Sequence, residues 1–102
     1  MKKLIIATIA VCLSAFLLSA QAYTGQEFSK DARINLKAAR EIALKAFPGK
    51  ITDEELEKED GGSGLRYSFD IKRGKSSQTQ EVGVDAITGK ILENATEGPN
   101  PD

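Results

Sequence analysis

Most of the side chains in this sequence that could act in catalysis or bind a metal are carboxylates. One run gathers six of them, namely Asp53, Glu54, Glu55, Glu57, Glu59 and Asp60. Two such groups can act as general acid and base when one is desolvated, and clustered oxygen ligands suit calcium. The run is highly charged, which favours solvation, and it lacks the D-x-D-x-D-G spacing of an ordered calcium loop. We interpret it as a water-facing acidic edge strand, with weak calcium binding as the alternative.

Other residue types used in catalysis are scarce. The chain has no His and no Trp, and its single cysteine, Cys12, lies in an apolar N-terminal segment. A chain without Cys12 would lack the commonest general base, a thiolate nucleophile and the soft metal ligands. We therefore expect no enzymatic activity, no resident metal and no cofactor.

The N-terminal segment has the pattern of a secretory signal peptide over residues 1–22. Two lysines precede an apolar run from Leu4 to Leu18, and Ala20 and Ala22 supply the small residues of a cleavage site. The run is shorter than the ~20 apolar residues of a membrane-spanning helix. Val11 before Cys12 is too large for a lipidation site. We expect a periplasmic or secreted protein that begins at Tyr23 and has no membrane association after cleavage.

The composition of the processed chain limits its partners. Without the signal peptide, 80 residues remain, with 12 basic and 15 acidic side chains and a net charge of −3. This acidity argues against binding to nucleic acid, which needs a basic surface, or to anionic lipid. A chain of this length forms one small domain with a limited core.

One amphipathic helix is predicted after residues 23–33, which we expect to be a flexible lead-in. Asn35 is a good N-cap, and Pro48 with Gly49 ends the helix. Apolar residues recur on one helical stripe, formed by Leu36, Ala39, Ile42, Ala43, Ala46 and Phe47.

Strands follow the helix. Residues 65–72 and 80–86 alternate apolar and polar residues, which predicts an antiparallel hairpin with its charged and hydroxyl side chains facing water. Residues 51–59 are ambiguous, because Thr52 and Glu55 also fit the capping box of a helix. Residues 94–102 are polar and contain prolines, so we expect a disordered tail.

A tight turn is predicted at the end of the second strand of this hairpin. The Asp85 carboxylate can accept backbone N–H groups one to three residues later, and Thr88 can add a local hydrogen bond. Gly89 can take the positive φ that closes such a turn. We interpret these residues as structural and not catalytic.

The order of these elements resembles a known family. The helix reads A-x-x-I-A-L-x-x-F-P-G, formed by Ala39, Ile42, Ala43, Leu44, Phe47, Pro48 and Gly49, and the turn reads V-D-A-x-T-G-K-I-L over residues 84–92. Together they resemble the PepSY domain, which occurs in propeptides of thermolysin-like metallopeptidases and in YpeB-type germination proteins. The resemblance covers residues 34–93. It implies an α+β fold with one helix on an antiparallel sheet of three or four strands, and it implies that residues 51–59 form a strand.

The resemblance also implies a regulatory binding role. No peptidase domain accompanies the module in this sequence, so we expect it to regulate or inhibit a peptidase or other envelope protein in trans, as a monomer or weak dimer. An open sheet edge could hold an extended partner segment, and the outer face carries a mixed polar surface that includes Arg66, Ser68 and Asp70. The alternative is a cation-responsive accessory subunit of an envelope sensor or transporter.

Overall fold

The computed structural model describes residues 23–97. The expected signal peptide with Cys12, Ala20 and Ala22, and residues 98–102 of the expected tail, lie outside this range. The described elements are η1 (Gln26–Asp31), α2 (Leu36–Ala46), β1 (Lys50–Lys58), β2 (Leu65–Lys72), β3 (Thr79–Asp85) and β4 (Ile91–Glu97). They form one α-helix packed on a four-stranded antiparallel sheet, which confirms the predicted α+β fold.

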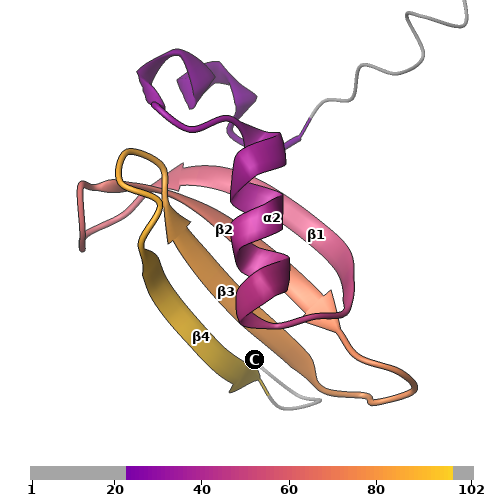
Figure 1. Cartoon of the computed structure of the whole chain (residues 1–102). Helices are drawn as coiled ribbons and strands as arrows, with labels where there is room; N and C mark the ends of the chain where they lie inside the picture. Colours follow the sequence, from indigo (N-terminus) through magenta and orange to yellow (C-terminus); the bar gives the residue numbers. More distant parts are fainter. Residues whose placement is uncertain (1–22, 98–102) are drawn as a thin grey trace, which may run out of the picture.

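The sheet is a simple meander. Its strands are ordered β1-β2-β3-β4, and each pairs antiparallel with the next. Helix α2 lies across one face of the sheet (Figure 1). Tyr67 of β2 lies opposite Leu56 of β1 and Val84 of β3, so one face of the strands gathers the large apolar side chains.

Helix α2 begins and ends where local chemistry requires. The Asn35 side chain accepts a hydrogen bond from the Ala38 N–H at 2.8 Å, which satisfies one free donor of the first turn. After Ala46 the backbone of Phe47 is extended, and Pro48 follows. Ala39 and Ala43 are fully buried, since only small side chains fit between the helix axis and the sheet.

The core lies between α2 and the sheet. Leu56, Phe69, Val82 and Val84 are almost completely buried there. Tyr67 is buried among them, and its hydroxyl donates to the Ile34 carbonyl at 2.8 Å, which satisfies its one polar group. This bond ties the segment before α2 to the centre of the sheet.

Two boundaries differ from the sequence prediction. Residues 23–33, expected to be a flexible lead-in, contain η1, and the Leu56 N–H donates to the Thr24 carbonyl at 2.8 Å. Phe28 also packs against the core. Residues 94–97, expected to belong to the disordered tail, are part of β4. Both segments are polar in sequence, and they are ordered by contact with strands: residues 23–33 with β1, and residues 94–97 with β3.

The ambiguous acidic segment is a strand. β1 covers Lys50–Lys58, close to the range 51–59 that the family resemblance implied. The capping box of Thr52 and Glu55 does not form, because pairing with β2 overrides the local helix preference. Within residues 23–97, no helix is both long and apolar enough to span a membrane.

Candidate functional site

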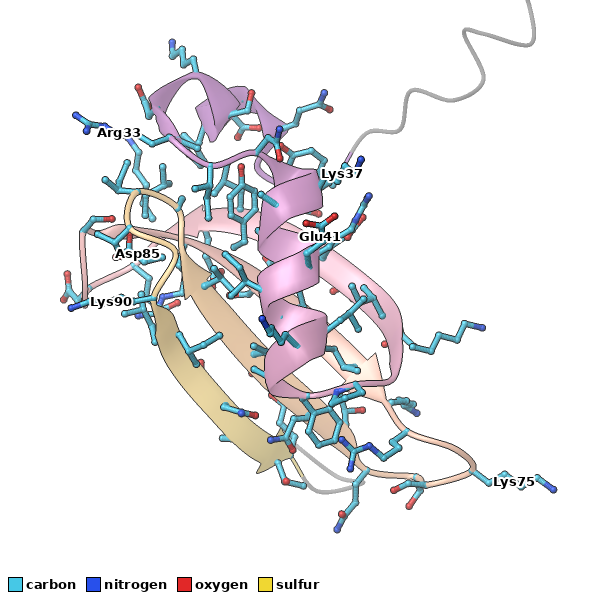
Figure 2. The ribbon with its side chains drawn as sticks, viewed as in Figure 1. Arg33, Lys37, Glu41, Lys75, Asp85 and Lys90 are labelled. Carbon is cyan, nitrogen blue, oxygen red and sulfur yellow. The ribbon has the colours of Figure 1, made fainter. Side chains whose placement is uncertain are left out.

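Asp85 is the most heavily hydrogen-bonded side chain described in the structure, and only 1% of its surface is exposed. Its Oδ1 accepts the backbone N–H groups of Ile87 and Thr88 at 2.8 and 3.0 Å. The Ser63 hydroxyl donates to Oδ1 at 2.8 Å, and the Ser63 N–H donates to Oδ2 at 2.7 Å. This group of four residues, here called the Asp85 clamp, joins the β1–β2 loop to the β3–β4 turn at one end of the sheet (Figure 2).

The electrostatics of the Asp85 clamp favour a permanent carboxylate. Burial raises the pKa of Asp85, but hydrogen bonds from Ser63, Thr88 and Ile87 outweigh it and lower the pKa to about 2. Both carboxylate oxygens are occupied by these donors. The clamp therefore holds two loops together and leaves no oxygen of Asp85 free for a substrate.

The rest of the turn completes this structure. The Thr88 hydroxyl accepts the Lys90 N–H at 3.2 Å, and the Gly89 N–H donates to the Asp85 carbonyl at 2.9 Å. Gly89 has φ +80°, a conformation that other residues rarely adopt. Sequence reasoning identified Asp85, Thr88 and Gly89 but missed Ser63, whose only sequence signal is its place in the glycine-rich loop 61–64.

The other sequence-predicted positions are not part of the Asp85 clamp. Asn35 caps the start of α2. At the other end of the helix, the Pro48 carbonyl accepts the Arg73 Nε–H at 3.0 Å. A Cβ on Gly49 would lie 2.6 Å from the Lys72 carbonyl oxygen, so glycine allows the chain to pass close to β2 there. These residues determine the fold and do not gather into a site.

The sheet face opposite α2 is strongly acidic. Side chains alternate between the two faces of a strand, so the residues beside the core positions project to this outer face. It carries seven carboxylates, here called the acidic face: Asp53, Glu55, Glu57, Asp70, Glu81, Glu93 and Glu97. Register places three basic residues on the same face, Lys50 and Lys72 near one end and Arg66 near the other.

Two residues of this face do not face water as the alternation predicted. Arg66 and Ser68 are only 7% and 6% exposed. Arg66 Nη2 donates to the Asp60 carbonyl at 3.0 Å, and Nη1 lies 3.7 Å from Glu93 Oε1. The Ser68 hydroxyl donates to Glu57 Oε2 at 2.8 Å. Ser68 is thus bonded to Glu57 of β1, and Arg66 reaches past Gly83 of β3 to Glu93 of β4. The exposed part of the face is therefore more acidic than its sequence composition.

Three carboxylates of the acidic face come within one small region. Asp70, Glu81 and Glu97 lie on β2, β3 and β4, and one oxygen from each lies within 4.8 Å of the others. A hydrogen bond to Glu97, burial and the charges of Glu93, Glu97 and Asp70 raise the pKa of Glu81 to about 8. Burial, together with the charges of Glu97, Asp53 and Glu55, also raises the pKa of Asp70. The raised pKa of Glu81 therefore favours its protonated form near neutral pH.

Four carboxylates of the acidic run singled out in the sequence lie on β1 and are divided between its two faces, whereas Glu59 and Asp60 follow the end of the strand. Glu54 projects toward α2 and forms a two-point ion pair with Arg40, at 2.8 and 2.7 Å. Asp53, Glu55 and Glu57 belong to the acidic face. Among residues 23–97, the carboxylates that gather most closely are Asp70, Glu81 and Glu97, a group that sequence reasoning missed because it placed Glu97 in the tail.

The raised pKa of Glu81 predicts a pH-dependent stability. A carboxyl group whose pKa rises on folding binds more protons in the folded state, so its stabilising effect is full below its ordinary pKa of 4.5 and is lost as pH rises toward about 8. We expect the free energy of unfolding to fall by about 1–2 kcal/mol across this range, after allowance for solvent screening. Urea unfolding at several pH values measures this fall.

The matched variants are Glu81→Gln and Glu41→Gln. Each removes one carboxylate, but Glu41 is exposed on α2, on the other side of the sheet (Figure 2). Glu81→Gln should flatten the pH dependence, whereas Glu41→Gln should leave it unchanged. An equal pH slope in Glu81→Gln and the parent protein would show that the pKa of Glu81 is not raised on folding.

The two edges of the sheet differ. At the β1 edge, Thr24 forms a parallel bridge with Glu55 and accepts the Leu56 N–H. At the β4 edge, no strand of residues 23–97 pairs with the side of β4 that faces away from β3. Ile91, at the start of β4, is 39% exposed and is the one large apolar side chain exposed among the described residues. β4 is therefore the more accessible edge.

Comparison with known proteins identifies the module. A family model described as "PepSY: Peptidase propeptide and YPEB domain" matches residues 33–94. No curated protein and no solved structure matches the chain. The match covers more than half of the sequence and includes α2, all of β1 to β3 and the turn of the Asp85 clamp. The chain therefore belongs to the PepSY family, that of the peptidase propeptide and YPEB domain.

Proposed function

We propose that this protein is an exported, non-catalytic binding module that docks in trans on a peptidase or another envelope protein. In this proposal an extended segment of the partner adds to the sheet beside β4. The observation that carries the proposal is the accessible β4 edge, in contrast to the β1 edge, where Thr24 is already bound. Family membership supports a propeptide-like or regulatory role.

The backbone of β4 offers a template for strand addition. Alternate residues of a strand direct their N–H and C=O groups to opposite sides. The Asp85 N–H donates to the Lys90 carbonyl, toward β4, and the Ala86 N–H donates to the Leu65 carbonyl, toward β2. By this alternation Glu93, Ala95 and Glu97 pair with β3, and the backbone groups of Asn94 and Thr96 face the free side. An extended peptide can use such groups without any rearrangement of the sheet.

The side chains support binding more than catalysis. Asp85, the most buried carboxylate, is committed to four hydrogen bonds within the protein. The partly exposed acidic face has no histidine beside it, because the chain contains none. A domain that presents an accessible strand edge and a charged sheet face is suited to recognition by backbone and charge.

Asn94→Pro tests the edge directly. Proline removes the N–H that we place on the free side, and proline is tolerated on an edge strand. With a C-terminally tagged full-length chain that the cell exports and processes, we expect crosslinking to capture a specific partner from envelope or medium fractions. We expect Asn94→Pro to reduce that capture about tenfold or more, as loss of a buried interface hydrogen bond and a steric clash would do.

Asn94→Ala is the matched control. The Asn94 Oδ1 accepts a hydrogen bond from Gln80, which both substitutions remove, but alanine keeps the backbone N–H. Capture should therefore persist in Asn94→Ala. Equal capture by both variants, or no specific capture by the parent protein, would contradict docking at the β4 edge. If the captured partner is a peptidase, addition of the purified protein should lower its activity.

A further inference from the structure

The β4 edge and the acidic face form one continuous surface. Glu93 and Glu97 lie on β4 itself, and Glu81 and Asp70 follow on β3 and β2. α2 packs on the opposite side of the sheet, and Tyr23 and Phe28 of the N-terminal segment also pack against the core there. Within residues 23–97, the one ion pair on this face joins Glu93 to the nearly buried Arg66. A partner at the β4 edge thus meets a surface of largely uncompensated negative charge.

We propose that this surface binds a lysine- and arginine-rich extended segment of a partner protein. This inference rests on the proposed function, since the backbone of the segment adds to β4 while its basic side chains reach the acidic face. Charge complementarity selects the segment: alternate side chains of an added strand project toward the acidic face, and every second one of these has the spacing of Glu93 and Glu97. A lysine or arginine side chain of the added strand reduces the repulsion between neighbouring carboxylates of the acidic face.

The same charges argue against a second copy of this chain as the occupant. If two β4 strands paired at their free edges, Glu93 and Glu97 of one copy would approach the same residues of the other. Like charges on paired strands are destabilising, and charged side chains are a common protection of edge strands against self-association. The acidic face thus disfavours pairing between copies and leaves the edge available to a basic partner.

The group formed by Asp70, Glu81 and Glu97 predicts how binding responds to pH. In the free protein the raised pKa of Glu81 keeps a proton on this group near neutral pH. An ammonium or guanidinium group placed beside it favours the ionised form, so binding should release a proton and tighten as pH rises from 6 toward about 8. The other charged groups on this face are Asp53, Glu55, Glu57, Glu93, Lys50, Lys72 and Arg66.

The test uses a fluorescent decalysine peptide as the probe and the exported, processed protein. Fluorescence anisotropy should show saturable binding that weakens with added salt, because exposed charges are screened. The double substitution Glu81→Gln with Glu97→Gln should weaken binding about three- to tenfold, the range expected when two partly exposed ion pairs are lost. Calorimetry in buffers of different ionisation enthalpy should detect the released proton, and the double variant should release none.

The matched control changes Glu27 and Glu41 to Gln, two exposed acids of η1 and α2, and gives the same net charge. It should bind decalysine as the parent does. An equal loss in both double variants would show attraction to net charge alone and would overturn the proposal. Complete displacement of the peptide by calcium at a concentration equal to that of the peptide would also overturn the proposal, because the carboxylates would then form a divalent-cation site.

Two results separate this inference from the proposed function. If Asn94→Pro lost the partner captured from the envelope while Glu81→Gln with Glu97→Gln kept it, docking at β4 would stand and the basic segment would be wrong. If the double variant lost the partner and Asn94→Pro kept it, the acidic face would bind a basic partner without strand addition. The inference is supported when both variants lose it and both controls keep it.

Discussion

Asp85→Ala is expected to lower the free energy of unfolding by about 2–4 kcal/mol. The substitution removes the acceptor of four partly buried hydrogen bonds and leaves the N–H groups of Ser63, Ile87 and Thr88 without their partner. It also separates the β1–β2 loop from the β3–β4 turn. In a domain of this size, such a loss removes a large part of the total stability. Urea unfolding at neutral pH, followed by circular dichroism, measures the change.

Asp85→Asn separates the effect of the charge of Asp85 from the effect of its size and shape. It retains the size of the side chain but loses the negative charge that the donors stabilise. A carboxyl group whose pKa falls on folding stabilises the protein above its ordinary pKa of 3.8, and this contribution is lost as pH falls toward about 2. The stability difference between parent and Asp85→Asn should thus be constant at neutral pH and shrink in acid. If Asp85→Ala unfolded like the parent but no longer bound the partner, the Asp85 clamp would be a binding site and our interpretation would be wrong.

Gly62→Ala is expected to cost about 2–4 kcal/mol, although it adds a single methyl group to an exposed loop. Gly62 has φ +54°, and its Cβ would lie 2.3 Å from Asp85 Oδ2 and 2.9 Å from Leu92 Cδ1. Asp85 cannot retreat easily, because it is held by its hydrogen bonds. The loop must therefore move away from Asp85, which breaks the bonds that Ser63 makes. The measurement is again the free energy of unfolding in urea.

Gly74→Ala isolates the contribution of backbone strain. Gly74 has a similar φ of +61°, but nothing lies within 4 Å of the Cβ that would be added. Gly74→Ala should lower the free energy of unfolding by only about 1 kcal/mol, the strain of a residue other than glycine in the left-handed conformation. In an Asp85→Ala background the cost of Gly62→Ala should fall toward the same value, because the two sites are coupled. Equal costs for Gly62→Ala and Gly74→Ala in the parent protein would show that the loop does not depend on its approach to Asp85.

The elements with strong local patterns were predictable. The alternation in residues 65–72 and the cap at Asn35 indicated β2 and the start of α2, because hydrophobic period and capping act over a few residues. β1 is different, since its residues favour a helix as readily as a strand. Its sequence has one fully buried apolar residue, Leu56, and its pairing with β2 decides its structure. From the sequence, only the family resemblance indicated that these residues form a strand and not a helix.

The candidate binding surface was harder to predict, because it depends on register between distant strands. Asp70, Glu81 and Glu97 are separated by 11 and 16 residues in sequence, and nothing local indicates that they meet. The polar composition of residues 94–97 indicated a tail. An edge strand that is exposed to solvent can, however, form without an alternating pattern of apolar residues. The burial of Arg66 was missed for the same reason, since long acidic side chains of other strands cover it.

The central claim is that a partner docks at the β4 edge. Its most direct test is backbone hydrogen exchange of the exported protein, free and in complex with the partner captured from the envelope. Docking by strand addition predicts new protection in β4, at Asn94 and Thr96, with α2 and the Asp85 clamp unchanged. Protection confined to α2 or to the Asp85 clamp, with β4 exchanging as in the free protein, would contradict it.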